Sequence, residues 1–170
     1  DNALRIDCNF SNLSGTNTTL SATDGTVERS FDVDNGTTTI WGLTESTTYD
    51  ITVLNNEGAA IYAQTVSTGA LPTSVGLSAT VSGTGNVEAV LVQDCSSDAM
   101  LVIFDAKGSI VWYQDIAALV PGAELLGYSL TETDSVVVLT GHDTIAEVAM
   151  SGEAIRTIAL ADYGLVGQLH

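Results

Sequence analysis

A short segment of this chain occurs twice, 44 positions apart. Residues 100–116 and residues 144–160 each contain an apolar run, a tight turn with a glycine, and a second apolar run. The two glycines, Gly108 and Gly152, stand at equivalent positions, where the turn between two antiparallel strands often requires a positive φ. The repeat therefore predicts two β-hairpins built on the same pattern.

The spacing of the repeat points to a larger architecture. Hairpins that recur every 40 to 50 residues, roughly, are typical of β-propeller blades, in which four-stranded sheets stack on their neighbours. A propeller closes only with several blades, and this sequence ends at His170, soon after the second copy. We therefore expect residues 72–170 to form the first blade or blades of an incomplete propeller. Within this range residues 75–81 alternate as a strand does, and residues 89–92 and 101–104 are apolar runs suited to strands covered on both faces.

The composition favours an all-β chain. Hydrophobic residues make up 45% of the sequence and glycines number 16, whereas Lys and Arg together number four. Short alternating runs of apolar and polar residues occur in the first seventy positions. These runs cover residues 4–10, 18–22, 27–33, 37–41, 49–54 and 60–67. Six or seven short strands at this spacing predict a small antiparallel β-sandwich.

The segment from Leu43 to Val53, Leu-Thr-Glu-Ser-Thr-Thr-Tyr-Asp-Ile-Thr-Val, resembles the fibronectin type III signature. In that family a leucine stands six residues before a tyrosine that begins an alternating strand. The resemblance implies a fibronectin type III-like sandwich over residues 1–71, with Tyr49 bonded through its hydroxyl to nearby backbone in a tyrosine corner. We place the domain boundary at Leu71-Pro72, after the last predicted strand.

The segment Ile103–Tyr113 resembles arylsulfotransferase-like propeller proteins, in which a strand ends in Asp-x-x-Gly and the next carries Val-Val-Trp. Quinoprotein-type and other propellers share this motif. The final Gly-Gln-Leu-His170 resembles the approach to a His-rich segment of the arylsulfotransferase-like family. The resemblance implies sulfuryl transfer from aryl sulfates to phenols, with His170 as a catalytic residue whose imidazole attacks sulfur.

Charge limits the partners of this chain. Asp and Glu number 21 against four Lys and Arg, which gives a formal charge of −17. Such a chain is repelled by phosphate backbones and anionic membrane surfaces, so nucleic acid is excluded as an expected partner. No run of about 18 apolar residues is available to insert into a membrane. Because the first residue is Asp rather than Met, we expect a removed leader and a secreted, periplasmic or cell-surface protein.

Other chemistry-bearing motifs are few. The sequence has no Gly-rich phosphate loop, Cys/His cluster or serine nucleophile elbow, so we expect no cofactor. Asp32 and Asp34 precede Asn-Gly and are weak candidates for calcium ligands, with a plain hairpin turn as the alternative. Cys8 is either a small core residue or the partner of Cys95 in a disulfide.

Three aromatic residues and one histidine are also candidates for functional or structural roles. Trp112 and Tyr113 either stack on a ligand or, as we expect, pack between blades, and Trp41 is expected in the core. His142 is expected in a solvated turn.

Two hypotheses of function follow. In the first, the chain is the amino-terminal portion of a secreted arylsulfotransferase-like propeller protein, whose partners are the rest of the propeller and a small phenolic or sulfated substrate. In the alternative, it is a non-enzymatic surface, filament or adhesion protein that assembles with copies of itself through exposed strand edges.

Overall fold

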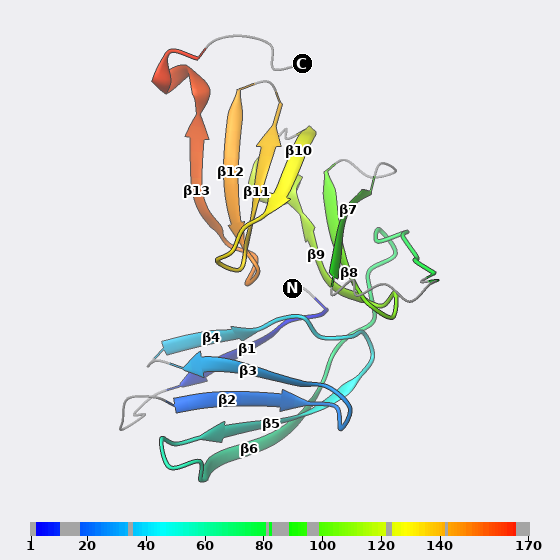
Figure 1. Cartoon of the computed structure of the whole chain (residues 1–170), viewed down its shortest axis with the longest axis vertical. Coiled ribbons are helices and arrows are strands. Elements are labelled where there is room, and N and C mark those ends of the chain that lie inside the picture. The colour runs from blue at the N-terminus through cyan, green and yellow to red at the C-terminus, as the bar shows by residue number, and fades with distance from the viewer. Residues whose placement is uncertain are drawn as a thin grey trace. The chain divides into compact units, whose positions relative to one another are not determined.

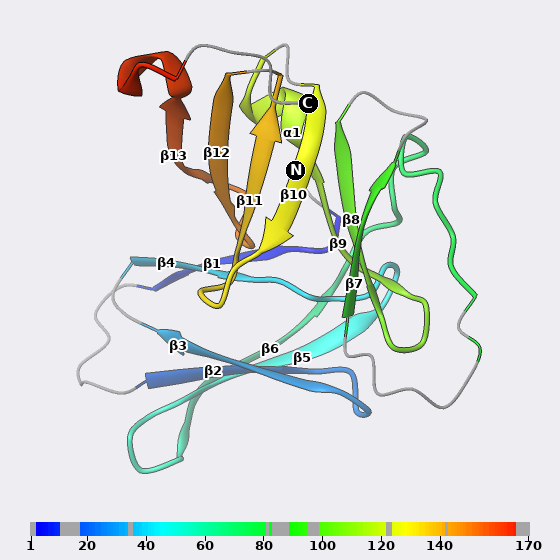
Figure 2. The same ribbon diagram turned by 45° about the horizontal axis from the view of Figure 1, so that its top comes forward.

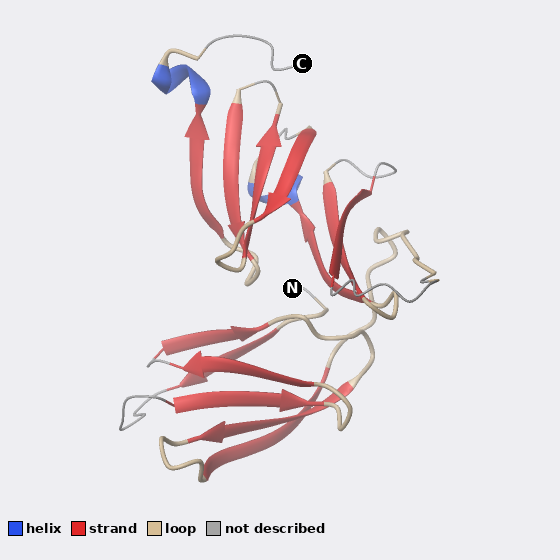
Figure 3. Cartoon of the chain, in the orientation of Figure 1, coloured by secondary structure: helices blue, strands red, loops and turns tan. Residues whose placement is uncertain are grey.

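The computed structural model describes residues 3–10, 18–33, 36–80, 82, 89–94, 99–121, 124–141 and 143–165. As expected from the composition, this part of the chain is all-β, with four antiparallel sheets, none of them closed, and two short helices (Figure 3). The chain divides into two compact units, Asp1–Pro72 (unit 1) and Thr73–His170 (unit 2). In the described ranges, no helix is long and apolar enough to cross a membrane.

The described residues of unit 1 form six strands in two sheets (Figure 1). In chain order the strands are β1 (Ile6–Phe10), β2 (Thr18–Thr23), β3 (Glu28–Val33), β4 (Gly36–Ile40), β5 (Thr48–Leu54) and β6 (Ala60–Ser67). One sheet has two strands, in the order β1-β4, and the other has four, in the order β3-β2-β5-β6. All six strands coincide closely with the predicted alternating runs.

Local hydrogen bonds explain where the hairpins of unit 1 turn. Between β2 and β3 the Asp24 carboxylate accepts from the backbone N–H groups of Val27 and Thr26, both at 2.8 Å, and these bonds hold the pKa of Asp24 below its ordinary value. Between β5 and β6 the Asn55 side chain accepts from backbone N–H groups of the turn, and Gly58 supplies a φ of 77°. Short polar side chains and glycine thus end each strand.

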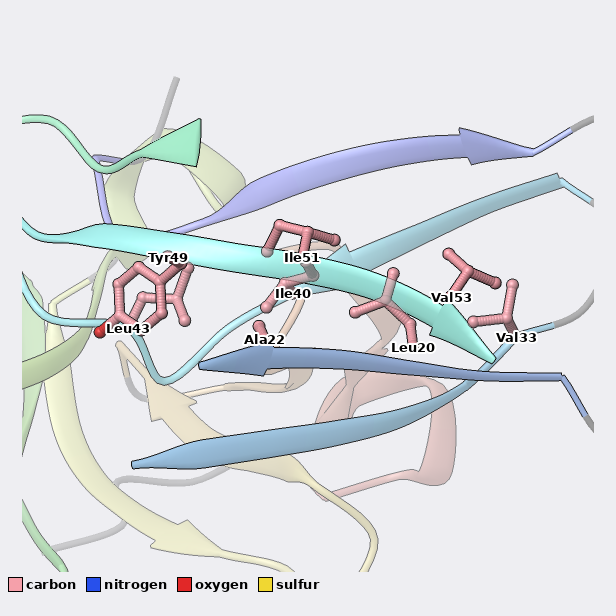
Figure 4. Close-up of a cluster of buried hydrophobic side chains, with 8 residues drawn as sticks. All are labelled: Leu20, Ala22, Val33, Ile40, Leu43, Tyr49, Ile51 and Val53. Atoms are coloured by element: carbon pink, nitrogen blue, oxygen red, sulfur yellow. The ribbon is translucent and has the colours of Figure 1, made fainter. Parts of the chain in front are cut away.

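The two sheets of unit 1 share one core. Its buried members come from β2, β3, β4, β5 and the turn before β5, and each is at most 5% exposed. They are Leu20, Ala22, Val33, Ile40, Leu43, Tyr49, Ile51 and Val53 (Figure 4). Ile6, Cys8 and Phe10 of β1 pack against this cluster while remaining half-buried. Burial of these side chains is what holds the two sheets together.

In unit 2 the part of the chain that the structure describes forms seven strands in two sheets (Figure 2). They are β7 (Ala89–Asp94), β8 (Met100–Asp105), β9 (Ile110–Asp115), β10 (Leu125–Leu130), β11 (Ser135–Thr140), β12 (Thr144–Ala149) and β13 (Ala154–Ala159). Each sheet follows chain order, β7-β8-β9 and then β10-β11-β12-β13. Helix α1 (Ile116–Leu119) follows β9, and the 3-10 helix η1 (Leu160–Tyr163) follows β13.

The repeated segment forms two hairpins of the same geometry, β8–β9 and β12–β13. In the first, the N–H of Asp105 donates to the Ser109 carbonyl at 2.9 Å and that of Gly108 to the Asp105 carbonyl at 3.0 Å. Ala149 and Gly152 make the equivalent bonds, at 2.9 and 2.8 Å. Each hairpin also has a register shift at the equivalent place, and both glycines have positive φ. The two predicted hairpins are confirmed.

Strands β8 and β9 are buried on both faces. Every residue from Met100 to Phe104 and from Ile110 to Tyr113 is buried. The indole N–H of Trp112 donates to the Met150 carbonyl at 2.9 Å, which joins the β7-β8-β9 sheet to the end of β12 in the next sheet. The expectation that Leu101–Phe104 forms a strand covered on both faces is confirmed. The same expectation for Ala89–Val92 was wrong, because Val90 of β7, the first strand of its sheet, is 46% exposed.

One predicted alternation did not become a strand. Residues 75–81 alternate in sequence, but the described part, 75–80, forms no strand, although Val75 is buried. Alternation predicts which side chains face the core, whereas a strand also requires a neighbouring strand with which to bond.

Candidate functional site

Most of the catalytic and metal candidates from the sequence lie outside the described residues. His170, His142 and Asp34 fall in the ranges that the structure does not describe. Asp32 is exposed on β3, paired in register with Thr19. The plain hairpin expected after it is wrong, because β3 and β4 belong to different sheets and do not pair with each other. Among the described residues, no three His, Cys, Asp or Glu side chains are gathered in a way that could hold a metal ion.

The aromatic candidates are packing residues. Trp112 is 1% exposed and Tyr113 is 7% exposed, so each is covered although they point to opposite faces of β9. Both faces of β9 are therefore buried at this pair. Trp41 is half-buried and meets Phe31 edge-on, with ring centroids 6.0 Å apart.

The tyrosine corner has the predicted hydrogen bond. The backbone N–H of Thr44 donates to the Tyr49 hydroxyl at 2.9 Å, and both Tyr49 and Leu43 are buried. Figure 4 shows these two side chains at the same end of the core cluster. A hydroxyl that would be costly to bury unbonded is thus satisfied by the turn before its own strand.

Unit 1 has a groove of about 680 Å³ between β1 and β6, which are edge strands among the described residues. We call it the β1–β6 groove. Its lining comes from all five residues of β1, the middle of β5 and the inner side of β6. These are Ile6, Asp7, Cys8, Asn9, Phe10, Ile51, Val53, Ile61, Tyr62, Gln64 and Val66.

The β1–β6 groove exists because the two sheets of unit 1 differ in width. Two strands face four, so the core-facing side of β6 is only partly covered. On that side Val66 is half-buried, Gln64 is exposed and Tyr62 is 48% exposed. The register of β6 on β5 sets these three residues opposite the buried Tyr49, Ile51 and Val53. The groove is therefore an open section of the hydrophobic core.

Cys8 lies in this groove as a free thiol. Burial raises the pKa of the Cys8 thiol, and the neighbouring Asp7 carboxylate raises it further. The possible disulfide to Cys95 is not formed at Cys8, and Cys95 itself lies outside the described residues. A thiol with a raised pKa is a weak nucleophile at neutral pH, so Cys8 contributes apolar lining.

The charge around the groove is negative. Asp7 is the one charged residue of the lining, and the Thr39 hydroxyl donates to it at 2.7 Å. In sequence, unit 1 carries nine Asp and Glu residues against two arginines, Arg5 and Arg29. An occupant of the groove is therefore favoured electrostatically if it is neutral or basic.

The β10-β11-β12-β13 sheet carries a second open feature. One face of this sheet holds Val136, Val138 and Val148, which are fully buried, and the feature is the other face. The register places Leu139, Ile145 and Ile158 in one row across that opposite face, and all three are half-buried. Beside this row the Arg156 guanidinium pairs with the Glu147 carboxylate at 2.8 Å. We call this surface the outer face of unit 2.

Sequence reasoning missed both open features. The alternation that predicted β1 and β6 could not show that β1 pairs with β4, more than 25 residues away, and that the described strands form one sheet of two and one of four. One residue in the sequence could have indicated the groove. Gln64 is polar, although it lies on the same side of β6 as Tyr62 and Val66. Comparison with known proteins adds no family: neither a protein-family model nor a curated protein sequence matches this chain.

Proposed function

We propose that the chain is a portion of an arylsulfotransferase-like β-propeller protein, in which the two sheets of unit 2 are consecutive blades. The observation that carries this proposal is the pair of hairpins with the same bonds and the same bulge 44 residues apart. The Trp112–Met150 hydrogen bond between the sheets supports stacking of one blade on the next. The outer face of unit 2 would then be covered by a further blade of the protein.

Unit 1 fits a fibronectin type III-like sandwich placed before the propeller. Support comes from the strand orders β1-β4 and β3-β2-β5-β6 and from the Tyr49 hydroxyl at the turn before β5. In this proposal unit 1 is a folded module outside the catalytic part, and the protein is secreted, periplasmic or on the cell surface.

In the proposed reaction a neutral imidazole, that of His170, attacks the sulfur of an aryl sulfate. The sulfur–oxygen bond breaks, the phenolate leaves, and the sulfuryl group is carried on the ring nitrogen until an acceptor phenol displaces it. The acceptor loses its proton as the new sulfate ester forms. The developing charge on the sulfuryl oxygens requires cationic or hydrogen-bonding groups from the rest of the propeller.

The test is sulfuryl transfer by the full-length gene product. With p-nitrophenyl sulfate as donor and a phenol as acceptor, we expect p-nitrophenolate release that depends on the acceptor, and a loss of at least about a hundredfold in His170→Ala. His142→Ala is the matched control and should keep most of the activity. A gene without further hairpin repeats after His170, or a full-length protein without transfer, would contradict the proposal.

A second candidate function is assembly of copies through strand edges, and the exposure of β13 favours it. This strand is the last of its sheet, its residues Ala154 to Thr157 are exposed, and Ile155 is 54% exposed. An exposed apolar edge strand is a template for pairing with another chain. Because each copy carries −17, pairing should strengthen as salt screens the repulsion.

Light scattering on size-exclusion fractions tests this second candidate. We expect a dimer or larger species at about 1 M NaCl, where the Debye length is about 3 Å, and its loss in Ile155→Lys. Leu165→Lys, which changes another exposed apolar residue to the same cation, should not alter the association. A monomer at all salt concentrations would exclude the candidate.

A further inference from the structure

We propose that the β1–β6 groove binds an extended segment of a different protein, added as a strand beside β1, with apolar side chains at alternate positions and basic residues at its ends. The inference concerns unit 1 and goes beyond the proposed propeller function, which rests on unit 2. It assigns unit 1 a binding role of its own.

The groove follows β1, an edge strand among the described residues. Strand β1 has β4 as its single neighbouring strand in the described parts of unit 1, and β6 has β5 alone. The groove runs along the whole of β1, since residues of both strand faces, such as Asp7 and Cys8, line it. An extended chain in this position would continue the two-stranded sheet and lie opposite the core-facing side of β6. Strand addition of this kind uses main-chain hydrogen bonds for affinity.

The side chains at the floor of the groove belong to the core of unit 1. The floor of the groove includes Ile51 and Val53, both members of the buried core, and its sides include the half-buried Cys8 and Val66. In an added strand every second side chain would point at this apolar surface. The intervening residues would face outward. Alternation of apolar and polar residues is therefore the recognition pattern.

The negative charge of unit 1 selects the occupant of the groove. The lining contains Asp7, with no Lys or Arg, and unit 1 as a whole is acidic. A second copy of this chain would bring a further −17, whereas a strand with basic ends is attracted. The favoured occupant is thus a neutral-to-basic segment of another protein.

The experiment uses the whole chain and a synthetic peptide of about nine residues, a little longer than the usual strand. The probe is acetyl-Lys-Thr-Val-Thr-Ile-Thr-Val-Thr-Lys-amide with a fluorescent label, and binding is followed by fluorescence anisotropy. Gln64→Arg places a charge inside the groove, and Ala63→Arg places the same charge on the opposite side of β6. Both positions are exposed, so both variants should fold, and circular dichroism checks this.

We expect the peptide to bind the unmodified chain and the Ala63→Arg variant with similar affinity, and Gln64→Arg at least tenfold more weakly. The new guanidinium would be covered by apolar side chains of the peptide and would repel its terminal lysines. Exchanging the terminal lysines for glutamates, or two central threonines for prolines that remove backbone donors, should each abolish measurable binding. Binding should also weaken as salt increases.

Two readouts locate the peptide independently of the variants. Bound peptide should slow amide hydrogen exchange at residues 6–10, and it should slow alkylation of Cys8 followed in a Cys95→Ser background. Absence of binding up to about 1 mM peptide, equal binding by both arginine variants, or undiminished binding of the proline peptide would each overturn the inference. A dimer formed through β1 that the peptide does not displace would overturn it in favour of a second copy.

Discussion

Replacing Trp112 by alanine is expected to destabilise unit 2 by about 3 to 5 kcal/mol, the range typical for deleting a large buried aromatic side chain. The indole is 1% exposed and is the largest of the fully buried side chains. Its removal also leaves the Met150 carbonyl without the bond from Trp112 at 2.9 Å. Both effects weaken the contact between the β7-β8-β9 sheet and the sheet that follows.

The measurement is urea unfolding combined with amide hydrogen exchange, read separately on peptides from each unit, because a chain of two units need not unfold in one step. Exchange should accelerate at residues 100–115 and 135–149. Trp41→Ala is the matched control: the same side chain is deleted at a half-buried site in unit 1, and the loss there should be smaller. A cost below about 1 kcal/mol for Trp112→Ala would mean that the two sheets do not depend on this contact.

The repeated hairpins were predictable because their geometry is set locally. A glycine at position 108 or 152 supplies the positive φ that ends the turn, and the flanking apolar runs supply two strands of matched length. The tyrosine corner was predictable for the same reason, since Tyr49 bonds to Thr44, five residues earlier. Short-range hydrogen bonds of this kind leave a pattern that one sequence can show.

The β1–β6 groove was not predictable because it depends on pairing between distant segments. Phe10 pairs with Gly36 across the β1-β4 sheet, and Val53 pairs with Tyr62 in the other sheet. Neither pairing alone creates the groove, which arises from the different numbers of strands in the two sheets. For residues 75–80 the prediction of a strand was wrong. Their alternation is that of a strand, but no pairing partner is present among the described segments.

Replacing Leu43 by alanine is expected to destabilise unit 1 by about 2 to 5 kcal/mol. Leu43 is fully buried at the end of the core cluster that also holds Tyr49, and the turn backbone that carries it is fixed by the Thr44–Tyr49 hydrogen bond. With the backbone held, the surrounding side chains have little freedom to fill the space left by the deletion, which places the cost toward the upper part of the range. The same urea and hydrogen-exchange experiment, read at residues 48–54, measures it.

Tyr49→Phe separates the two parts of the motif. This change keeps the ring and removes the acceptor of the Thr44 N–H, so the expected loss is about 1 to 3 kcal/mol, the cost of leaving a buried donor unbonded. Leu43→Ala should therefore cost as much as Tyr49→Phe or more, and the double variant should cost less than the sum if Leu43 and Tyr49 act as one unit. If Tyr49→Phe were the more damaging change, the corner would be held mainly by its hydrogen bond, and packing beneath the ring would be secondary.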